Sequence, residues 1–490
     1  MNHKMALLHS KFYHYARASG LVGKEVLDGL LRESYDYVEK GKKLRDNSLD
    51  PTSCAEPFPA LTSSPTSPQN ESQQPEYQQN EVRLRYGKRV AIRNAEKITN
   101  TNSSTPPIDT PKAVDDLLAA VDGNTASKNS PRMTELDRCL AELLVNRGIL
   151  NRWQTTQLLE GRTKFTLGNY LILNAIGKGG YGHVFLGREC EIDANKNKPI
   201  LRKTDLRQTN LRQTDAAGNS LVALKVLPIT KSTPELSERF RNEITLQKRL
   251  WHRNLVRFID SGHDGNVDFM VHEFIDGGDV RALLQREGVL PYDTAAAIIA
   301  DLARGVQYLH DQGIVHRDIK PANILISSNG EAKLIDLGLS VEFNCNNAKN
   351  ETAKIENGNN FDKDVNKEVD KMNTSKIAGT VDYVAPDQIC NPNEPVPAWD
   401  IYSIGCSFYQ LLAGKVPFPK GDMKQKLTAH VNIDPIDPRI LNQSIPFHIA
   451  EIALSMLAKD PTKRIKSANE IIEKLSPWIP PDGLAGQIIK

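Results

Sequence analysis

Hydrophobic and polar positions alternate with strand-like and helix-like periods over most of the chain, from about residue 165 to residue 478. This stretch of roughly 310 residues is large enough for a two-lobed domain. Two polar insertions interrupt it, at about residues 190–220 and 341–371. The first contains a five-residue unit repeated three times, LRKTD, LRQTN and LRQTD, and the second is rich in Asn, Lys and Asp. Three short copies cannot bury a core, so we expect an extended hairpin or loose expansion rather than a solenoid.

The N-terminal part of the chain has one helical pattern followed by a long polar stretch. In residues 1–47, whose role the sequence does not reveal, apolar residues recur near helical spacing over Lys24–Leu44, which predicts a helix. Residues 48–131 are rich in Pro, Ser, Thr, Asn and Gln and too poor in large apolar residues to offset the entropy of ordering. We therefore expect a disordered linker there.

The linker includes a basic segment, VRLRYGKRVAIR, at residues 82–93. A solvated basic patch is the favoured interpretation, and a docking site for an acidic partner is the alternative. After the linker, residues 132–164 are expected to form a small helical lead-in, because Thr134 and Asp137 have the spacing of a capping box and apolar residues follow at helical spacing. Residues 479–490 are expected to form a C-terminal tail.

Composition places the chain among ordinary globular proteins. Hydrophobic residues make up 39% and charged residues 25%, so a sizeable core can form. The net charge of +2 provides no global field for nucleic acid or anionic lipid, and we expect no nucleic-acid partner. The six cysteines have neither CxxC pairs nor ligand-like spacing against histidine, which argues against zinc and disulfides and favours a reducing compartment.

The sequence also bears on membrane insertion. No run reaches the roughly 18 to 20 apolar residues that a membrane-spanning helix needs. The start of the chain, MNHKMALLHSKFYHYARASG, is too polar for the apolar region of a signal peptide. We expect a soluble, cytoplasmic protein without a membrane span.

A glycine-rich motif opens the 165–478 region: Gly177-Lys178-Gly179-Gly180-Tyr181-Gly182-His183-Val184. The GxGxxG spacing alone is weak evidence, because dinucleotide-binding folds and ordinary turns also use it. A dinucleotide site needs a helix directly after the glycines, whereas HVFLGRE has no helical period and is typical of the return strand of a hairpin. Backbone without Cβ can lie close to phosphate oxygens and donate its N–H groups to them.

A lysine follows within an apolar strand pattern, VALKV, at Lys225. A buried lysine is costly unless it is paired. Glu243 is its expected partner, on a helical pattern whose Leu236, Phe240 and Ile244 define the inward face. Such a pair would aim the ammonium group at α- and β-phosphates. An exposed lysine at a strand end is the alternative.

The strongest motif is IVHRDIKPANIL, from Ile314 to Leu325, which follows an amphipathic helical pattern. Asp318 is expected to orient a substrate hydroxyl and accept its proton, and Lys320 to neutralise charge on a transferring phosphoryl group. Asn323 offers an oxygen to magnesium, a hard cation that prefers oxygen ligands. Asp336, at the end of the apolar KLI strand and before a glycine, is expected to be a second magnesium ligand.

These motifs in this order resemble the eukaryotic-type serine/threonine protein kinase family, and we expect a bacterial member. The resemblance covers about residues 169–475 and includes GTVDYVAPD, DIYSIG and Arg464 of KDPTKRI, the expected partner of Asp387. Lys320 and Thr380 are similar to the serine/threonine branch rather than the tyrosine branch. The resemblance implies transfer of the ATP γ-phosphoryl group to Ser or Thr hydroxyls of proteins, with self-phosphorylation included.

The resemblance implies an α+β, two-lobed protein kinase fold formed by residues 165–478. A small antiparallel β-rich N-lobe would carry one regulatory helix, a larger C-lobe would be mainly α-helical, and ATP and Mg²⁺ would bind between them. The implied catalytic residues are Asp318, Lys320, Lys225 and Glu243, and the implied metal ligands are Asn323 and Asp336. The implied ATP contacts are Ile176, Gly177, Lys178, Gly179, Gly180, Tyr181, Gly182, His183, Val184, Ala223, Lys225, Glu273, Ile275, Asp279 and Leu325.

Three positions depart from the family pattern. Leu337 replaces the usual Phe after the metal-binding Asp, an apolar exchange that we expect to cost little. Asp387 replaces Glu, which shortens the reach to Arg464 by one methylene. His272 stands just before the expected hinge at Glu273–Ile275, where an apolar residue is commoner. A buried histidine with satisfied hydrogen bonds is favoured over one that narrows the adenine back pocket or adds pH sensitivity.

Two other functions compete with catalysis. A pseudokinase or scaffold would bind nucleotide or partners without efficient transfer, although every residue type that the chemistry needs is present. Alternatively, the N-terminal region recruits partners and the catalytic domain is secondary. If the enzyme is active, we expect phosphorylation at Thr374 or Ser375, because Arg317 beside the catalytic aspartate resembles the phosphate-reading arginine of the family.

Overall fold

The computed structural model divides into two compact units. Unit 1 comprises Met1–Thr230 with Gly262–Phe269, and unit 2 comprises Lys231–Ser261 with Met270–Lys490. The residues that the structure describes are 10–47, 134–178, 182–190, 192–193, 198–199, 221–229, 232–343 and 380–480. The basic segment, the triple repeat, and Thr374 and Ser375 lie outside these ranges.

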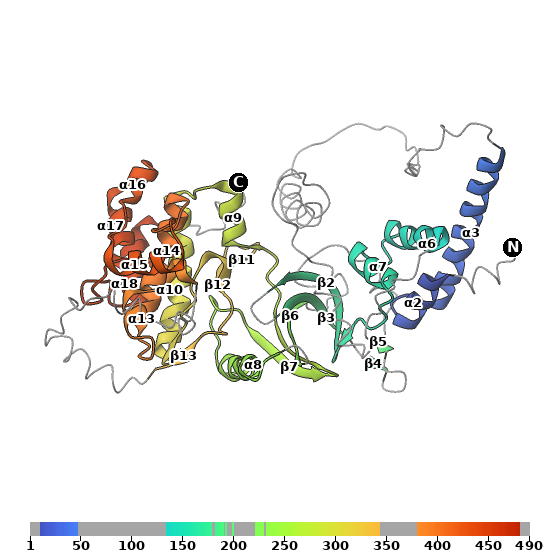
Figure 1. Cartoon of the computed structure of the whole chain (residues 1–490), viewed down its shortest axis with the longest axis horizontal. Coiled ribbons are helices and arrows are strands. Elements are labelled where there is room, and N and C mark those ends of the chain that lie inside the picture. Colours follow the sequence, from blue (N-terminus) through green and yellow to red (C-terminus); the bar gives the residue numbers. More distant parts are fainter. Residues whose placement is uncertain are drawn as a thin grey trace, which may run out of the picture. The chain divides into compact units, whose positions relative to one another are not determined.

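Four helices of unit 1 lie together (Figure 1), and they share one hydrophobic core. They are α2 (Lys11–Ser19), α3 (Lys24–Asn47), α6 (Glu135–Asn146) and α7 (Arg152–Leu159). The predicted helix is confirmed as α3 and extends three residues further. Helix α2 was not predicted, because its nine residues alternate aromatic, basic and small side chains without a long apolar stripe, and contacts with α6 and α7 stabilise it. We call this group of helices the helical module.

The Asp137 carboxylate connects the starts of two helices in the helical module, α2 and α6. Its Oδ1 accepts hydrogen bonds from Ser10 Oγ at 2.7 Å and from the Phe12 amide at 3.0 Å. Its Oδ2 accepts from the amide and hydroxyl of Thr134, at 3.0 and 2.9 Å. The predicted capping box at the start of α6 is therefore confirmed, and the same buried carboxylate also binds the start of α2.

The sheet of unit 1 is antiparallel. Its strands are β1 (Thr166–Leu167), β2 (Tyr170–Lys178), β3 (His183–Glu189) and β6 (Leu221–Pro228), paired in that order. Strand β3 is the segment HVFLGRE, so the expected return strand after the glycines is confirmed. The tip of the hairpin formed by β7 (Phe258–Asp264) and β8 (Val267–Glu273) also belongs to unit 1, where Asp264 Oδ1 binds Lys164 Nζ at 2.7 Å. A two-stranded ribbon, β4 (Ile192–Asp193) and β5 (Lys198–Pro199), lies at the first insertion.

Unit 2 is mainly helical. Its helices are α8 (Pro234–Gln247), α9 (Val280–Glu287), α10 (Tyr292–Asp311), α13 (Pro386–Cys390), α14 (Pro397–Ala413), α15 (Met423–Asn432), α16 (Pro438–Leu441), α17 (Phe447–Met456) and α18 (Ala468–Leu475). Its short strands are β9 (Gly278–Asp279), β10 (Ile314–Val315), β11 (Ile324–Ile326), β12 (Ala332–Leu334) and β13 (Val341–Glu342). A sheet-bearing unit and a helical unit confirm the expected α+β, two-lobed fold.

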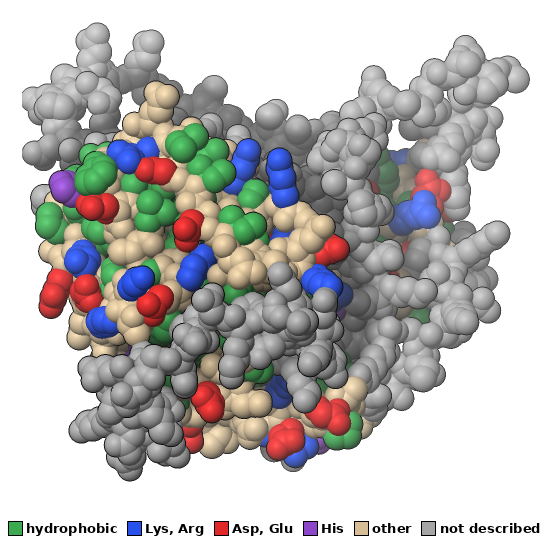
Figure 2. Space-filling model, turned by 60° about the vertical axis from the view of Figure 1, so that its left-hand side comes forward, with side chains coloured by type: hydrophobic (Ala, Val, Ile, Leu, Met, Phe, Trp, Pro, Cys, Tyr) green, Lys and Arg blue, Asp and Glu red, His purple; other side chains and the backbone are tan. Residues whose placement is uncertain are grey.

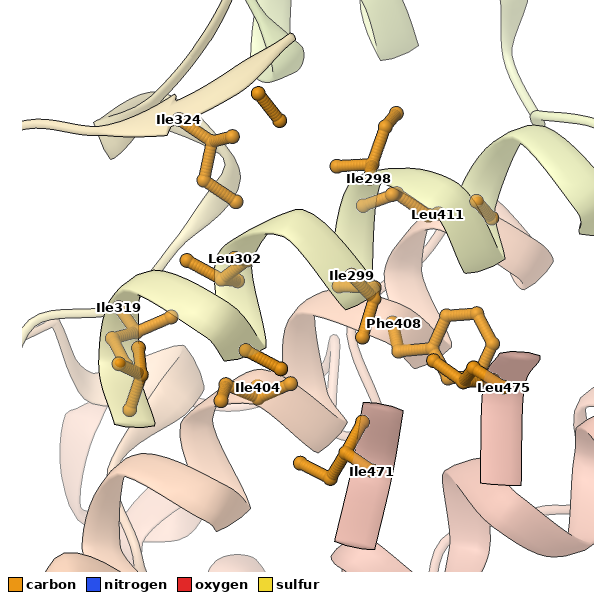
Figure 3. Close-up of a cluster of buried hydrophobic side chains, with 14 of the residues drawn as sticks. Ile298, Ile299, Leu302, Ile319, Ile324, Ile404, Phe408, Leu411, Ile471 and Leu475 are labelled. Carbon is orange, nitrogen blue, oxygen red and sulfur yellow. The ribbon is translucent and has the colours of Figure 1, made fainter. Parts of the chain in front are cut away.

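The core of unit 2 is formed around α10 (Figure 3). Ile298 and Leu302 on α10 pack with Ile404 and Phe408 of α14, and Ile471 of α18 lies in the same cluster. Their side chains are buried, as the predicted apolar face of this helix requires. This rigid core supports the loop that follows α10.

The described surface in Figure 2 is mixed in charge. On the described part of the face in Figure 2, Lys and Arg side chains are interspersed with Asp and Glu side chains. This agrees with the small net charge. Among the described helices, none combines the length and the apolar character that crossing a bilayer requires.

Asp400, on α14, holds the loop after α10 and β10. Its Oδ2 accepts from the His316 amide at 2.8 Å and from His310 Nε2 at 2.9 Å, and its Oδ1 accepts from the Arg317 amide at 2.9 Å. Burial on its own raises the pKa of Asp400, but the hydrogen bond and charge of His310 and the His316 amide hold that pKa below its ordinary value. The ionised carboxylate is therefore the form that the folded loop needs.

We predict that Asp137→Ala lowers the free energy of unfolding by about 2–3 kcal/mol, because it leaves buried donors of the α2 and α6 N-termini without their acceptor. Chemical denaturation of the full chain measures the change. Glu142→Ala, on the exposed side of the same helix, is the control and should change stability by less than about 0.5 kcal/mol. Equal stability of the two variants would show that Asp137 does not join α2 to α6.

We also predict that Asp400→Asn destabilises the protein by about 2–4 kcal/mol at pH 7, since an amide oxygen cannot replace both carboxylate oxygens in a buried site. A carboxyl whose folded-state pKa is lowered contributes stability above its unfolded pKa of about 3.9 and loses it as the pH falls through the folded value. The difference in the free energy of unfolding between wild type and Asp400→Asn should thus disappear below about pH 4. Denaturation at several pH values, with exposed Asp311→Asn as control, checks this; a gap that is independent of pH would contradict it.

Candidate active site

Asp318 lies at the centre of a cluster of polar side chains in unit 2. Lys320 Nζ is 2.6 Å from Asp318 Oδ2, and Asn323 Nδ2 donates to the Asp318 carbonyl at 2.8 Å and to Oδ2 at 3.1 Å. Thr380 donates to Asp318 Oδ1 from its amide at 3.1 Å and from its hydroxyl at 2.9 Å. The structure therefore brings together Asp318, Lys320 and Asn323, as their motif indicated, and it adds Thr380 to them.

The contact between Thr380 and Asp318 shows what the carboxylate can do chemically. A threonine hydroxyl donates to Oδ1, within the distance at which a general base accepts a proton. Lys320 Nζ also donates to Thr380 Oγ1 at 2.7 Å, so one ammonium group contacts both the carboxylate and the hydroxyl. This arrangement suits a reaction in which a hydroxyl loses a proton while negative charge develops nearby.

Asn323 and Asp336 provide oxygen donors beside this cluster. Both contacts of Asn323 Nδ2 are with Asp318, which orients the amide and leaves Oδ1 as the atom that can act as a metal ligand. The Ile335 amide donates to the Asn323 carbonyl at 2.9 Å and fixes the residue before Asp336 against Asn323. A carboxylate and an amide oxygen fit a hard divalent cation, so the donor set suits the expected metal.

Backbone strain is concentrated in this site. Among the described residues, Arg317 and Asp336 are the non-glycine residues with positive φ, each at 68°. This conformation costs on the order of 1–2 kcal/mol and persists where the surroundings enforce it. Here the Arg317 amide donates a hydrogen bond to Asp400 Oδ1, and the Gly338 amide donates one to Asp336 Oδ1 at 3.3 Å.

Leu337 follows Asp336 and is 7% exposed within the core of unit 2. It lines a small, mostly apolar pocket next to Asp336 with Gln247, Leu250, Leu255, Val256 and Leu334. Leucine thus retains an apolar packing surface at this position.

The predicted partner of Asp387 is confirmed too: Arg464 Nη2 donates to its Oδ1 at 2.8 Å, and the guanidinium also donates to the carbonyls of Ala398 and Ala458.

The segment that begins at Thr380 is fixed to α14 and α15. Ser403 Oγ donates to the Tyr383 carbonyl at 2.8 Å, and the Tyr383 hydroxyl donates to Gln410 Oε1 at 2.6 Å. Lys426 Nζ forms an ion pair with Asp382 Oδ1 at 2.6 Å. These contacts with α14 and α15 hold the segment that begins at Thr380, the residue that donates to Asp318.

Several expected nucleotide contacts lie in unit 2. Asp279 pairs in register with Leu325 between β9 and β11, and its carboxylate also caps α9 by accepting from the Ala282 amide at 2.8 Å. Glu273 accepts from Lys333 Nζ at 2.7 Å, and Ile275 is buried. The sequence did not reveal the capping role of Asp279 or the partner of Glu273. Their roles in binding ATP stay predictions.

Gln247, which the sequence did not single out, connects two predicted residues. Its Nε2 donates to Glu243 Oε1 at 2.8 Å, and its Oε1 lies 2.5 Å from His272 Nε2. The interpretation of His272 as a buried histidine with a hydrogen-bond partner is therefore confirmed. The i, i+4 spacing of Glu243 and Gln247 on α8 was the available signal.

Other expected contacts lie in unit 1. Lys225 is buried in β6 opposite Val184 of β3, and Ala223 lies opposite Leu186. Lys225 and Glu243 belong to different units, so their pairing stays a prediction.

In the glycine-rich motif, Gly179, Gly180 and Tyr181 lie outside the described residues. Ile176, Gly177 and Lys178 are exposed, His183 is buried, and a Cβ at Gly182 would lie 2.6 Å from the Val226 carbonyl oxygen, so that position requires glycine.

Comparison with known proteins identifies the family. A profile described as "Protein kinase domain" matches residues 209–479, more than half of the chain. A probable serine/threonine-protein kinase of Clostridium perfringens is 27% identical over 311 residues, 63% of this chain and 38% of that protein. Serine/threonine-protein kinase PknB of Mycobacterium tuberculosis is 30% identical over 255 residues, 51% of this chain and 37% of that protein.

The matched segment thus spans less than two fifths of these relatives' own length. The family profile begins after the glycine-rich motif, within the first insertion, and includes Lys225, Glu243, Asp318, Asn323 and Asp336. The profile, the resemblance in motifs and the fold agree with one another. The chain belongs to the protein kinase family.

Proposed function

We propose that the protein is a serine/threonine protein kinase that transfers the γ-phosphoryl group of ATP to Ser or Thr hydroxyls of proteins. The observation that carries the proposal is the cluster of Asp318, Lys320, Asn323 and Thr380 within hydrogen-bonding distance. A carboxylate that accepts from a hydroxyl, next to a lysine and a metal-type oxygen donor, is the set that phosphoryl transfer requires. The relatives are named as serine/threonine kinases, which supports the same substrate class.

In the proposed reaction, Asp318 orients the hydroxyl of the protein substrate and accepts its proton. Lys320, held at 2.6 Å from Asp318, offsets the negative charge that develops on the phosphoryl oxygens. The backbone of the loop is held in position by Asp400, which accepts hydrogen bonds from the amides of His316 and Arg317. The protein thus contributes mainly positioning and charge stabilisation.

The cofactor proposed with ATP is Mg²⁺, with Asn323 Oδ1 and one carboxylate oxygen of Asp336 as its protein ligands. When bound, the cation neutralises charge on the phosphates. Lys225, aimed by its expected partner Glu243, and the glycine-rich motif are proposed to bind the triphosphate. Ala223, Val184 and Leu325 are proposed to contact adenine, and Glu273 to Ile275 to form the hinge. The cytoplasmic location and the absence of a nucleic-acid partner remain predictions from composition.

Self-phosphorylation in the segment between β13 and Thr380 is part of the proposal. Arg317 donates from Nε to the Leu339 carbonyl at 2.7 Å, and it lies close enough to Arg239 of α8 that the two charges interact. Burial lowers the pKa of Arg317, the nearby Asp400 carboxylate raises it, and Arg239 lowers it further. A phosphate group would relieve the repulsion between the two guanidinium groups.

We predict that Asp318→Asn reduces phosphoryl transfer from radiolabelled ATP to a generic basic protein and to itself by at least ~10²-fold, because the amide cannot accept the proton. Phosphoamino-acid analysis of the wild-type products should give phosphoserine and phosphothreonine. Glu451→Gln, on the exposed surface of α17, is the control and should retain activity. Phosphotyrosine as the main product would contradict the specificity, and ATP binding without transfer by wild type would instead support the pseudokinase.

We predict that mass mapping of wild-type protein incubated with ATP finds phosphate at Thr374 or Ser375, where a charge of about −1.5 to −2 can bind Arg317 and Arg239. Asp318→Asn treated in the same way should lack this phosphate, which separates self-transfer from modification by other enzymes. A wild-type protein that transfers to substrates but carries no phosphate between residues 341 and 380 would refute self-phosphorylation there.

A further inference from the structure

Strand β2 is irregular just before the glycine-rich motif. Its pairing with β3 is regular up to Ile172, opposite Gly187, and resumes at Asn174, opposite Leu186. Leu173 is therefore an extra residue with no counterpart on β3, and a second irregularity follows between Ala175 and Gly177, where Ile176 is extra. A bulge of this kind bends the strand, increases its twist and changes which face the following side chains occupy. The course of β2 toward Ile176, Gly177 and Lys178 therefore depends on both irregularities, and Leu173 is where the first one begins.

A side chain from the helical module binds this bulge. Asn151 Nδ2 donates to the Leu173 carbonyl at 2.7 Å, where the strand irregularity interrupts the ladder. The Asn151 Oδ1 accepts from the Gln154 amide at 2.8 Å, and the Asn151 amide donates to Gln154 Oε1 at 3.2 Å. Asn151 therefore does two things at once: it caps α7, and it holds the backbone of β2. We call its bond to Leu173 the clasp.

Packing around the clasp connects the helical module to the same hairpin. The Leu173 side chain is partly buried against the core that α2, α3, α6 and α7 share. Trp153, on α7, has its ring centroid 6.1 Å from that of Phe185 on β3. Phe185 is fully buried, and its ring lies 6.2 Å from that of His183, the residue directly after the last glycine of the motif. Contacts thus run from α7 to both strands of the glycine-rich hairpin.

We propose that Asn151 is a positioning residue for nucleotide binding, which acts by fixing the β2 bulge and thereby the glycine-rich hairpin. The inference rests on the proposed function, because the hairpin is expected to bind ATP. It gives the N-terminal helices, to which the sequence assigned no role, a part in catalysis. One hydrophobic core joins the helical module to β2, from Phe12 of α2 to Leu171 of β2.

The substitution Asn151→Asp isolates the clasp. Aspartate caps a helix as well as asparagine does, so the bond from the Gln154 amide is retained. Aspartate has no N–H donor, and its carboxylate would face the Leu173 carbonyl. Since one hydrogen bond contributes modestly, we expect the full-length variant to bind ATP about three- to tenfold more weakly, with a matching rise in the KM for ATP. The kcat and the KM for the protein substrate should change less than about twofold.

Two controls separate positioning from general loss of structure. Asp422→Asn makes the reverse exchange at the N-cap of α15, which has the same capping box with a glutamine, Gln425; it should leave ATP binding unchanged. Asn151→Ser, which also keeps a capping oxygen but cannot reach Leu173, should reproduce the effect of Asn151→Asp. Hydrogen exchange of the backbone amides from Asn174 to Lys178 should be faster in both Asn151 variants than in wild type.

The outcomes are distinct. Wild type that binds and transfers ATP, together with Asn151→Asp of equal ATP affinity and equal exchange in β2, would overturn the positioning role. A lower thermal midpoint with unchanged ATP affinity would also overturn it, since the clasp would then serve stability alone. Wild type that binds no ATP would refute the proposed function instead. In that case, hydrogen exchange of the β2 amides that is equal in the Asn151 variants and in wild type would still show that the clasp does not hold β2.

Discussion

One buried carboxylate, that of Asp400, fixes the backbone on which the candidate active site is built. It is fully buried on α14, and it fixes the backbone at His316 and Arg317, which directly precede Asp318. Arg317 is held at a φ of 68°, a conformation that costs on the order of 1–2 kcal/mol. Two charge-assisted hydrogen bonds, each contributing about 1.5–3 kcal/mol, exceed that cost. Without them the loop would relax and Asp318 would leave its position beside Lys320 and Thr380.

In unit 1, two other polar side chains also hold backbone groups in position through hydrogen bonds. Asp137 accepts from the starts of α2 and α6, and Asn151 donates to an irregular strand, so each side chain satisfies backbone groups from distant parts of the chain. Backbone donors and acceptors that secondary structure leaves unpaired are expensive when buried. Polar side chains at such points therefore fix how helices and strands meet. In both units, the residues next to the candidate chemistry are positioned by side chains that take no part in it.

The sequence predicted the parts of the site that are close together in the chain. Asp318, Lys320 and Asn323 lie within one short loop, so their motif already determines that they meet. The strand after the glycines and the helix from Lys24 were predicted from periodicity for the same reason, since each is a local property.

Long-range partners could not be derived in this way. The bond from Thr380 to Asp318 joins residues 62 positions apart, and Ser10 to Asp137 spans 127 positions. The Asn151 clasp depends on a one-residue irregularity in pairing between β2 and β3, which hydrophobic periodicity does not specify. The role of Gln247 between Glu243 and His272 depends on how α8 packs against β8 within unit 2. Tertiary packing determines these contacts.

Asn323 and Asp336 are proposed to hold a metal-bound triphosphate next to Asp318. Calorimetric titration of the full chain with a non-hydrolysable ATP analogue tests it most directly, with and without Mg²⁺. Wild type should bind the analogue at least about tenfold more tightly with Mg²⁺ than without it, and Asp336→Asn should lose most of this dependence on the metal. Absence of nucleotide binding by wild type in the presence of Mg²⁺ would contradict the account.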